Sequence, residues 1–168
     1  MWPDTTEKVL EVKADMDARA AEKGRSLHYG WRSHVIVRET EDEARLAARR
    51  LLSKLDAETG EVIRNKSLDS TSAGVARQAA LRDSADDEGY VERHLWTGVG
   101  RARSGAGAAI VGDPDQVLGK IRELEDAGMG AFILSGYPHA AECDLFARYV
   151  LPELDHGRLE FIPDPVTI

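Results

Sequence analysis

Apolar residues recur along the chain at two spacings, one typical of helices and the other typical of strands. The short run Ala131–Leu134 is wholly apolar and is entered through two glycines, which predicts a strand buried on both faces, as in a parallel sheet. Apolar positions three and four residues apart predict helices elsewhere. These helices cover Asp4–Lys23, Thr40–Leu55, Asp113–Leu124 and Ala140–Leu151. An alternation of helices and strands is typical of an α/β fold.

The predicted strand at Ala131–Leu134 is followed by a polar segment that we expect to carry function. Ser135 and Gly136 come directly after it, and Pro138 cannot donate a backbone hydrogen bond to a sheet. Tyr137 and His139 therefore lie just beyond the carboxyl end of a buried strand, which is where ligands bind in α/β folds.

A second strand is predicted at Leu27–Val37, which is rich in β-branched and aromatic residues. Alternation places Arg32 and His34 on one face, and Trp31, Val35 and other apolar residues on the opposite face. A charged arginine among apolar neighbours is costly unless it is paired or near water. Two interpretations follow, an internal ion pair and a polar pocket that binds an anion or stabilises developing charge.

The segment 56–109 lacks strong periodicity, and segments of this length are usually lids, binding loops or inserts. Its glycine-rich end, residues 98–107, contains Arg101 and Arg103. Glycines let backbone N–H groups approach an anion, and arginine can bind one through two hydrogen bonds. A plain flexible linker is the alternative. The run lacks the Gly-Lys-Ser/Thr ending of a phosphate-binding Walker loop.

The composition limits the functional classes. A chain of 168 residues suffices for one domain, and its net charge of −8 argues against nucleic acid as the main partner. Cys143 is the only cysteine, His28 and His34 have no carboxylate at metal-ligand spacing, and neither a leader nor an apolar run of membrane-spanning length is present. We therefore expect a cytoplasmic protein without a metal site or a membrane partner.

Four blocks of sequence resemble a known family. They are WRSHVIVRETEDEA at 31–44, LWTGVG at 95–100, RSGAGAAIVGD at 103–113 and FILSGYPH at 132–139. In this order they resemble the bacterial alkanesulfonate monooxygenases, which are luciferase-like flavin monooxygenases. The resemblance covers nearly the whole chain and is weakest at 56–92 and in the tail.

The resemblance implies a fold, namely the C-terminal part of a (β/α)8 TIM barrel. Residues 1–168 would be a single partial barrel domain holding strands seven and eight, at Leu27–Val37 and Ala131–Leu134. Residues 56–109 would be the family's mobile lid, and 153–168 an extended C-terminal tail. The family's N-terminal strands, with an active-site cysteine and much of the flavin pocket, have no counterpart here, and Cys143 does not match that cysteine.

The resemblance also implies a reaction, in which reduced FMN from a separate flavin reductase and molecular oxygen convert an organosulfonate to an aldehyde and sulfite. Arg32, His34 and Tyr137 match catalytic positions, while Arg103, Ser135 and Gly136 are expected to contact the flavin. Activity would need a complement chain supplying six strands, or a homo-oligomer. The alternatives are a non-catalytic remnant or interaction module of the family, and a general anion-binding α/β domain.

Overall fold

The computed structural model describes residues 1–65, 72–103 and 105–157. Its centre is a mixed five-stranded sheet in the spatial order β2-β3-β4-β1-β5. The strands are β1 (Tyr29–Val37), β2 (Tyr90–Glu92), β3 (Leu95–Trp96), β4 (Ala109–Gly112) and β5 (Met129–Ser135). The carboxyl half of β1 pairs in parallel with β4, and most of β1 pairs in parallel with β5. The β2-β3 and β3-β4 pairs are antiparallel.

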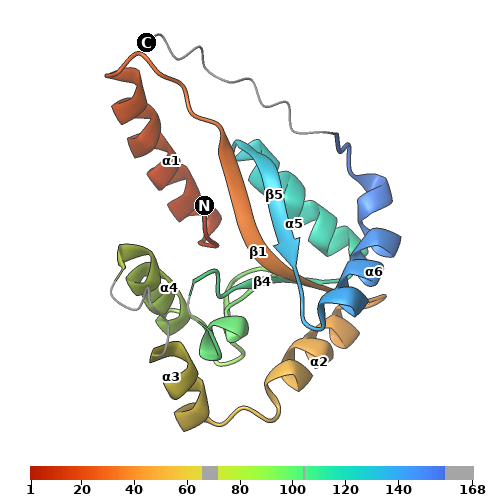
Figure 1. Ribbon diagram of the computed structural model, residues 1–168. Helices are drawn as coiled ribbons and strands as arrows, with labels where there is room; N and C mark the ends of the chain where they lie inside the picture. The colour runs from red at the N-terminus through yellow and green to blue at the C-terminus, as the bar shows by residue number, and fades with distance from the viewer. Residues whose placement is uncertain (66–71, 104, 158–168) are drawn as a thin grey trace.

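Six α-helices surround this sheet (Figure 1). They are α1 (Thr6–Ala21), α2 (Glu41–Leu52), α3 (Ala57–Asn65), α4 (Ala73–Asp83), α5 (Pro114–Asp126) and α6 (His139–Tyr149). Two short 3-10 helices, η1 (Gly98–Arg101) and η2 (Leu151–Glu153), complete the described elements. The predicted α/β alternation is confirmed. Most of the predicted tail, residues 158–168, lies outside the described residues.

Capping residues explain where several helices begin. The Thr40 side chain accepts a hydrogen bond from the backbone N–H of Glu43, and Asp113 and Gln116 form a reciprocal capping box at the start of α5. The predicted cap of α1 is wrong by one residue, because Thr5 rather than Asp4 accepts the N–H of Lys8. Asp4 instead accepts the N–H of Thr5.

The two faces of β1 have different surroundings. Trp31, Val35 and Val37 are almost fully buried and join the predicted apolar stripe of α5, which includes Val117 and Ile121, in the larger hydrophobic core. On the opposite face, Ile36 belongs to a second, smaller core beneath α2, which contains Ala44, Ala48, Trp96, Val99, Ala109 and Val111. The helices therefore cover one face of β1 along its length and the other face only near its carboxyl end.

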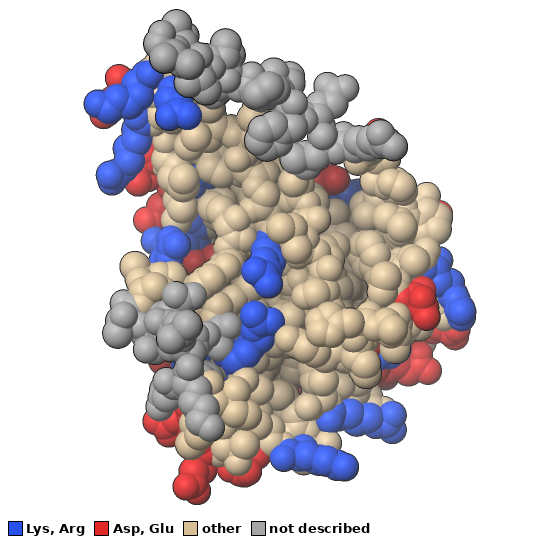
Figure 2. Space-filling model, viewed as in Figure 1, with Lys and Arg blue, Asp and Glu red and all other residues tan. Residues whose placement is uncertain are grey.

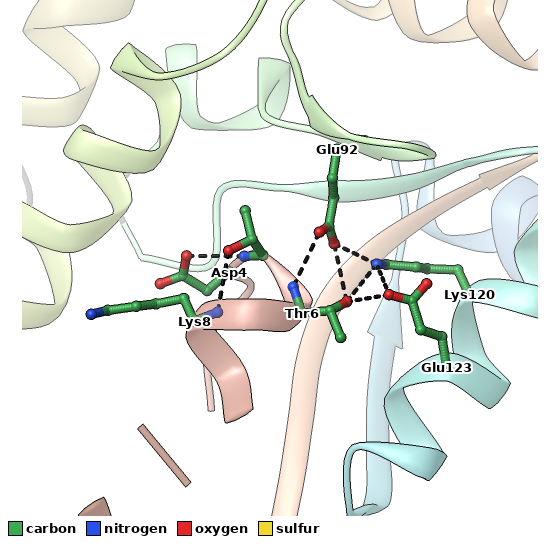
Figure 3. Close-up of polar contacts among 7 residues, drawn as sticks. Asp4, Thr6, Lys8, Glu92, Lys120 and Glu123 are labelled. Carbon is green, nitrogen blue, oxygen red and sulfur yellow. Dashed lines mark hydrogen bonds and ion pairs between the residues drawn. The ribbon is translucent and has the colours of Figure 1, made fainter. Parts of the chain in front are cut away.

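A buried lysine ties three distant parts of the chain together (Figure 3). Lys120 of α5 is only 4% exposed, forms ion pairs with Glu92 of β2 and Glu123, and donates to Thr6 Oγ1 at 2.9 Å. The carboxylate of Glu92 also accepts the backbone N–H of Thr6 at 3.1 Å. Because a buried ammonium needs such partners, this cluster fixes the first turn of α1 and strand β2 against α5.

Three expectations about the sheet are corrected. Two strands were predicted, but three more come from residues 90–112; β2 and β3 are too short to show an alternating pattern. The segment 56–109 is correspondingly not a uniform loop, because Leu95 and Trp96 are buried core residues. Finally, β5 is not buried on both faces. It lies at the edge of the sheet, and Ile133 is 65% exposed, because no described element covers that side.

Candidate functional site

The open face of the sheet carries the basic and aromatic residues singled out by the sequence. In the parallel register of β1 and β5, Arg32 lies beside Ile133, and His34 lies beside Ser135. Arg32 is exposed and forms no hydrogen bond or ion pair with any side chain in the described part of the chain, whereas His34 is only 3% exposed. The ion-pair interpretation of Arg32 thus finds no partner among the described residues, and water solvates the charge.

His34 is held by side chains from two other elements. Its Nδ1 lies 3.0 Å from Ser135 Oγ at the end of β5, and its Nε2 lies 3.4 Å from Nη1 of Arg103. Burial, followed by the positive charge of Arg103, lowers the pKa of His34 from 6.5 to about 4. Because a guanidinium can only donate, a neutral His34 presents Nε2 as the acceptor and keeps its proton on Nδ1, toward Ser135.

Arg103 reaches this site from the glycine-rich segment. Gly100 donates its N–H to the carbonyl of Gly107 at 2.7 Å, which joins the two ends of the loop. A Cβ on Gly107 would lie 2.8 Å from the Cα of Gly100, so this close approach requires a residue without a side chain. The closed loop turns Arg103 toward the sheet, where its Nη1 donates to the hydroxyl of Tyr137 at 3.1 Å.

Tyr137 completes an aromatic stack over the end of the sheet. Its ring stacks on His34 with centroids 5.1 Å apart, and His139 packs edge-on against it at 4.8 Å. The predicted positions Arg103, His34, Tyr137 and Ser135 are therefore brought together at the carboxyl ends of β1 and β5. Arg32 lies on the same face two residues before His34, toward the amino end of β1.

Gly136 has a packing role. It is buried, and a Cβ at this position would lie 2.4 Å from the Cβ of Glu142 in α6. Glu142 is itself buried and forms an ion pair with Arg38 at 2.6 Å. The tight contact lets α6 pack close to the end of β5, so that Tyr137 lies over the sheet. Neither Glu142 nor its pairing with Arg38 was identified from the sequence, because the two residues are far apart in the chain.

A mainly apolar cavity of about 330 Å³ adjoins the site. Arg103 and Tyr137 form its polar side, and the other lining residues are Leu51, Leu52, Leu55, Val99 and Ala102. Apolar walls with a few placed donors are typical of cofactor sites, and a flat aromatic ring system with polar edges fits this arrangement. Leu51 of α2 is 36% exposed at this cavity.

The described residues also limit whether the chain can hold a metal ion or cross a membrane. No group of three or more His, Cys, Asp and Glu side chains within the described ranges is arranged to hold a metal ion. None of the described helices is both long and apolar enough to cross a membrane.

The fold agrees with a known sequence family. Residues 1–130 match the family described as Luciferase-like monooxygenase, and the chain belongs to this family. The chain is 65% identical over 159 residues to a sulfoquinovose monooxygenase of Novosphingobium aromaticivorans and 53% identical over 154 residues to a sulfoquinovose monooxygenase of Agrobacterium fabrum. These alignments cover 95% and 92% of this chain but 44% and 40% of the relatives, so the chain spans less than half of their length.

Solved structures show the same architecture at low sequence identity. Riboflavin lyase RcaE, solved with modified FMN and its substrate riboflavin, matches with a TM-score of 0.62 at 18% identity, covering 92% of this chain and 37% of the lyase. DmoA from Hyphomicrobium sulfonivorans also gives 0.62, at 17% identity, covering 91% of this chain and 36% of DmoA. The predicted fold class, part of a luciferase-like α/β barrel, is confirmed.

Proposed function

We propose that this chain supplies the anion-binding part of a flavin-dependent monooxygenase site that acts on an organosulfonate. The observation that carries the proposal is the convergence of Arg103, His34, Tyr137 and Ser135 at the carboxyl ends of two parallel strands. Arg32 lies on the same open face and forms no side-chain hydrogen bond or ion pair with the residues that the structure describes. Family membership and the names of the two relatives support a monooxygenase reaction on a sulfonate.

The substrate class follows from charge and from the relatives. A sulfonate carries one negative charge and three acceptor oxygens, which suits an arginine with an unused guanidinium such as Arg32. The resemblance of the motifs alone favours an alkanesulfonate. The 65% identity to a sulfoquinovose monooxygenase supports a sugar sulfonate instead, and we propose the latter as the preferred substrate.

The residues near the apolar cavity fit a flavin, and Arg103 and Tyr137 would contact it. Bound reduced FMN would supply the electrons for activation of molecular oxygen. The chain's own groups then bind and orient: Arg103 places a positive charge over the cavity and holds the Tyr137 hydroxyl, while neutral His34 accepts from Arg103. With its oxygen accepting from Arg103, the hydroxyl of Tyr137 keeps its own proton free for donation to a developing anion.

The open side of the sheet indicates which partner the chain would bind. Ile133 is 65% exposed on edge strand β5, and an uncovered apolar edge strand is the type of surface that pairs with another chain or segment. We propose that the remaining strands of a luciferase-like barrel cover it, and that a separate flavin reductase supplies the reduced cofactor.

The test is co-expression of this chain with the part of the Novosphingobium relative that it does not match. Sulfite release is measured with reduced FMN, oxygen and either sulfoquinovose or octanesulfonate. We expect sulfite from sulfoquinovose and much less from octanesulfonate. The reverse preference would support the alkanesulfonate assignment. A stable complex that binds FMN yet releases no sulfite from either compound would reject the enzyme proposal and favour a non-catalytic interaction module.

A further inference from the structure

A second cavity opens on the same face as the candidate site, toward the amino end of β1. It has a volume of about 480 Å³ and is lined by Met1, Trp2, Arg32, Gly74, Arg77 and Ile133. No acidic residue is among these six, and two of them are arginines. The central part of the molecular face drawn in Figure 2 is largely uncharged, with a few basic side chains near its centre. The cavity therefore combines positive charge with apolar walls.

Its two arginines come from different layers of the molecule. Arg32 stands on β1, and Arg77 projects from α4, in the first part of the inserted segment. Within the described ranges, Arg77, like Arg32, forms no hydrogen bond or ion pair through its guanidinium. The carboxylate of Asp4 lines an adjoining cavity that Arg77 also lines, and the two side chains interact through space. The donors of both guanidiniums are thus available to a ligand.

The position of α4, and with it that of Arg77, is fixed by contacts with the first residues of the chain and with the glycine-rich segment. Gln78 donates to the carbonyl of Pro3 at 2.6 Å and accepts the N–H of Gly107 at 3.1 Å. The ring of Trp2 lies so close to the same helix that a Cβ on Gly74 would be 2.9 Å from it. The carbonyl of Met1 in turn accepts the N–H of Arg32 at 2.9 Å. One continuous set of contacts therefore connects α4 to the strand that carries Arg32.

We propose that Arg77 is a second substrate-binding arginine, which binds the sulfonate group together with Arg32. The inference rests on the function proposed above and adds a specificity-determining residue to it. Two guanidiniums that line one cavity can share the three oxygens of one sulfonate, while Ile133 and Trp2 offer apolar surface to the carbon skeleton. Arg77 thereby selects for a fully ionised, three-oxygen anion.

The experiment measures binding rather than turnover. The complex of this chain with the complementary part of the Novosphingobium relative is titrated calorimetrically with sulfoquinovose and with glucose, without flavin. The variants are Arg77→Gln, Arg77→Lys, Arg32→Gln and, as a control on the exposed side of α5, Arg122→Gln. Loss of one charge-assisted contact is worth about 1.5–3 kcal/mol, so Arg77→Gln should weaken sulfoquinovose binding by about tenfold to a hundredfold. Arg77→Lys should recover part of the loss, and Arg122→Gln should bind like the wild type.

The outcomes separate the inference from the function on which it rests. If Arg32→Gln weakens binding and Arg77→Gln does not, the proposed function stands and the role of Arg77 is rejected. If the wild type binds sulfoquinovose no better than glucose, both are rejected. Circular dichroism and the affinity of the two chains for each other show whether Arg77→Gln still folds. If it does not, Arg77→Lys decides: weaker binding by this folded variant supports the role, and wild-type affinity rejects it.

Discussion

The two faces of strand β1 have different roles, because one contributes to stability and the other to ligand recognition. On one face, Trp31, Val35 and Val37 are buried against α5 and contribute to the main core. On the other, Arg32 is open to solvent, and His34 is buried by the polar loop that carries Arg103 rather than by an apolar helix. A single strand thus anchors the fold through its odd-numbered residues and presents ligand-binding groups through its even-numbered ones. Substitutions on the two faces should therefore have different consequences.

The largest effect on folding is expected from Trp31→Ala on the covered face. Removing a fully buried tryptophan leaves a cavity and typically costs about 3–5 kcal/mol in the free energy of unfolding. The Nε1–H of Trp31 has no partner within the described part of the chain, which shifts the cost toward the lower end of that range. Urea denaturation of the isolated chain provides the measurement. The matched control is Ile133→Ala on the open face, expected to change the stability of the isolated chain by no more than about 0.5 kcal/mol. Equal losses would contradict the division between the faces.

The largest effect on catalysis is expected from Arg32→Ala on the open face. Loss of one preorganised charge-stabilising donor typically lowers a rate by about 10²–10³, equivalent to roughly 3–4 kcal/mol. Because Arg32 is exposed and its side chain forms no hydrogen bond or ion pair with the described residues, folding should be unaffected. Sulfite release by the reconstituted complex and its circular dichroism test both statements. Near-normal turnover by a folded Arg32→Ala protein would remove Arg32 from the site.

A third prediction concerns the pH dependence of stability. Burial lowers the pKa of His34 to about 4 in the folded protein, from 6.5 when exposed, so the unfolded chain binds the extra proton first. The contribution of His34 to the free energy of unfolding is therefore fully present above about pH 6.5. Roughly 3 kcal/mol of it is lost as the pH drops toward 4. His34→Asn should flatten this dependence. Denaturation midpoints between pH 4.5 and 7.5 measure the difference.

The smallest expected effect is a gradient of amide hydrogen-exchange rates along residues 56–109. Val62 and Ile63 of α3 are 46% and 45% exposed, while Leu95 and Ile110 of the added strands are fully buried. Amide hydrogen exchange should therefore be fastest in α3, intermediate in α4 and slowest in β4. A sulfonate that engages the arginines should slow exchange in α4 and around Arg103. Uniform strong protection from α3 to β4 in the free protein would show that no part of the segment acts as a lid.

The local sequence determined the two long strands, several of the helices and the two faces of β1. Alternation in β1 separates Trp31 from Arg32, and side-chain oxygens start α2 and α5, because these are short-range consequences of backbone geometry and capping. The motifs likewise singled out Arg32, His34, Arg103, Ser135 and Tyr137, four of which meet at the ends of β1 and β5. A strand only two residues long, such as β3, has no period to detect.

Tertiary structure alone decided the contacts between residues far apart in the chain. Lys120 can lie on the buried side of α5 because Glu92 of β2 neutralises its charge and Thr6 of α1 accepts a hydrogen bond from it. The sequence suggested burial of Ile133, yet strand order places it at an open edge. Arg77 carried no local signal, and only the packing of α4 against Trp2 and Pro3 brings it to the cavity of Arg32. Pairing and burial between distant segments depend on the whole packed arrangement, which local periodicity does not encode.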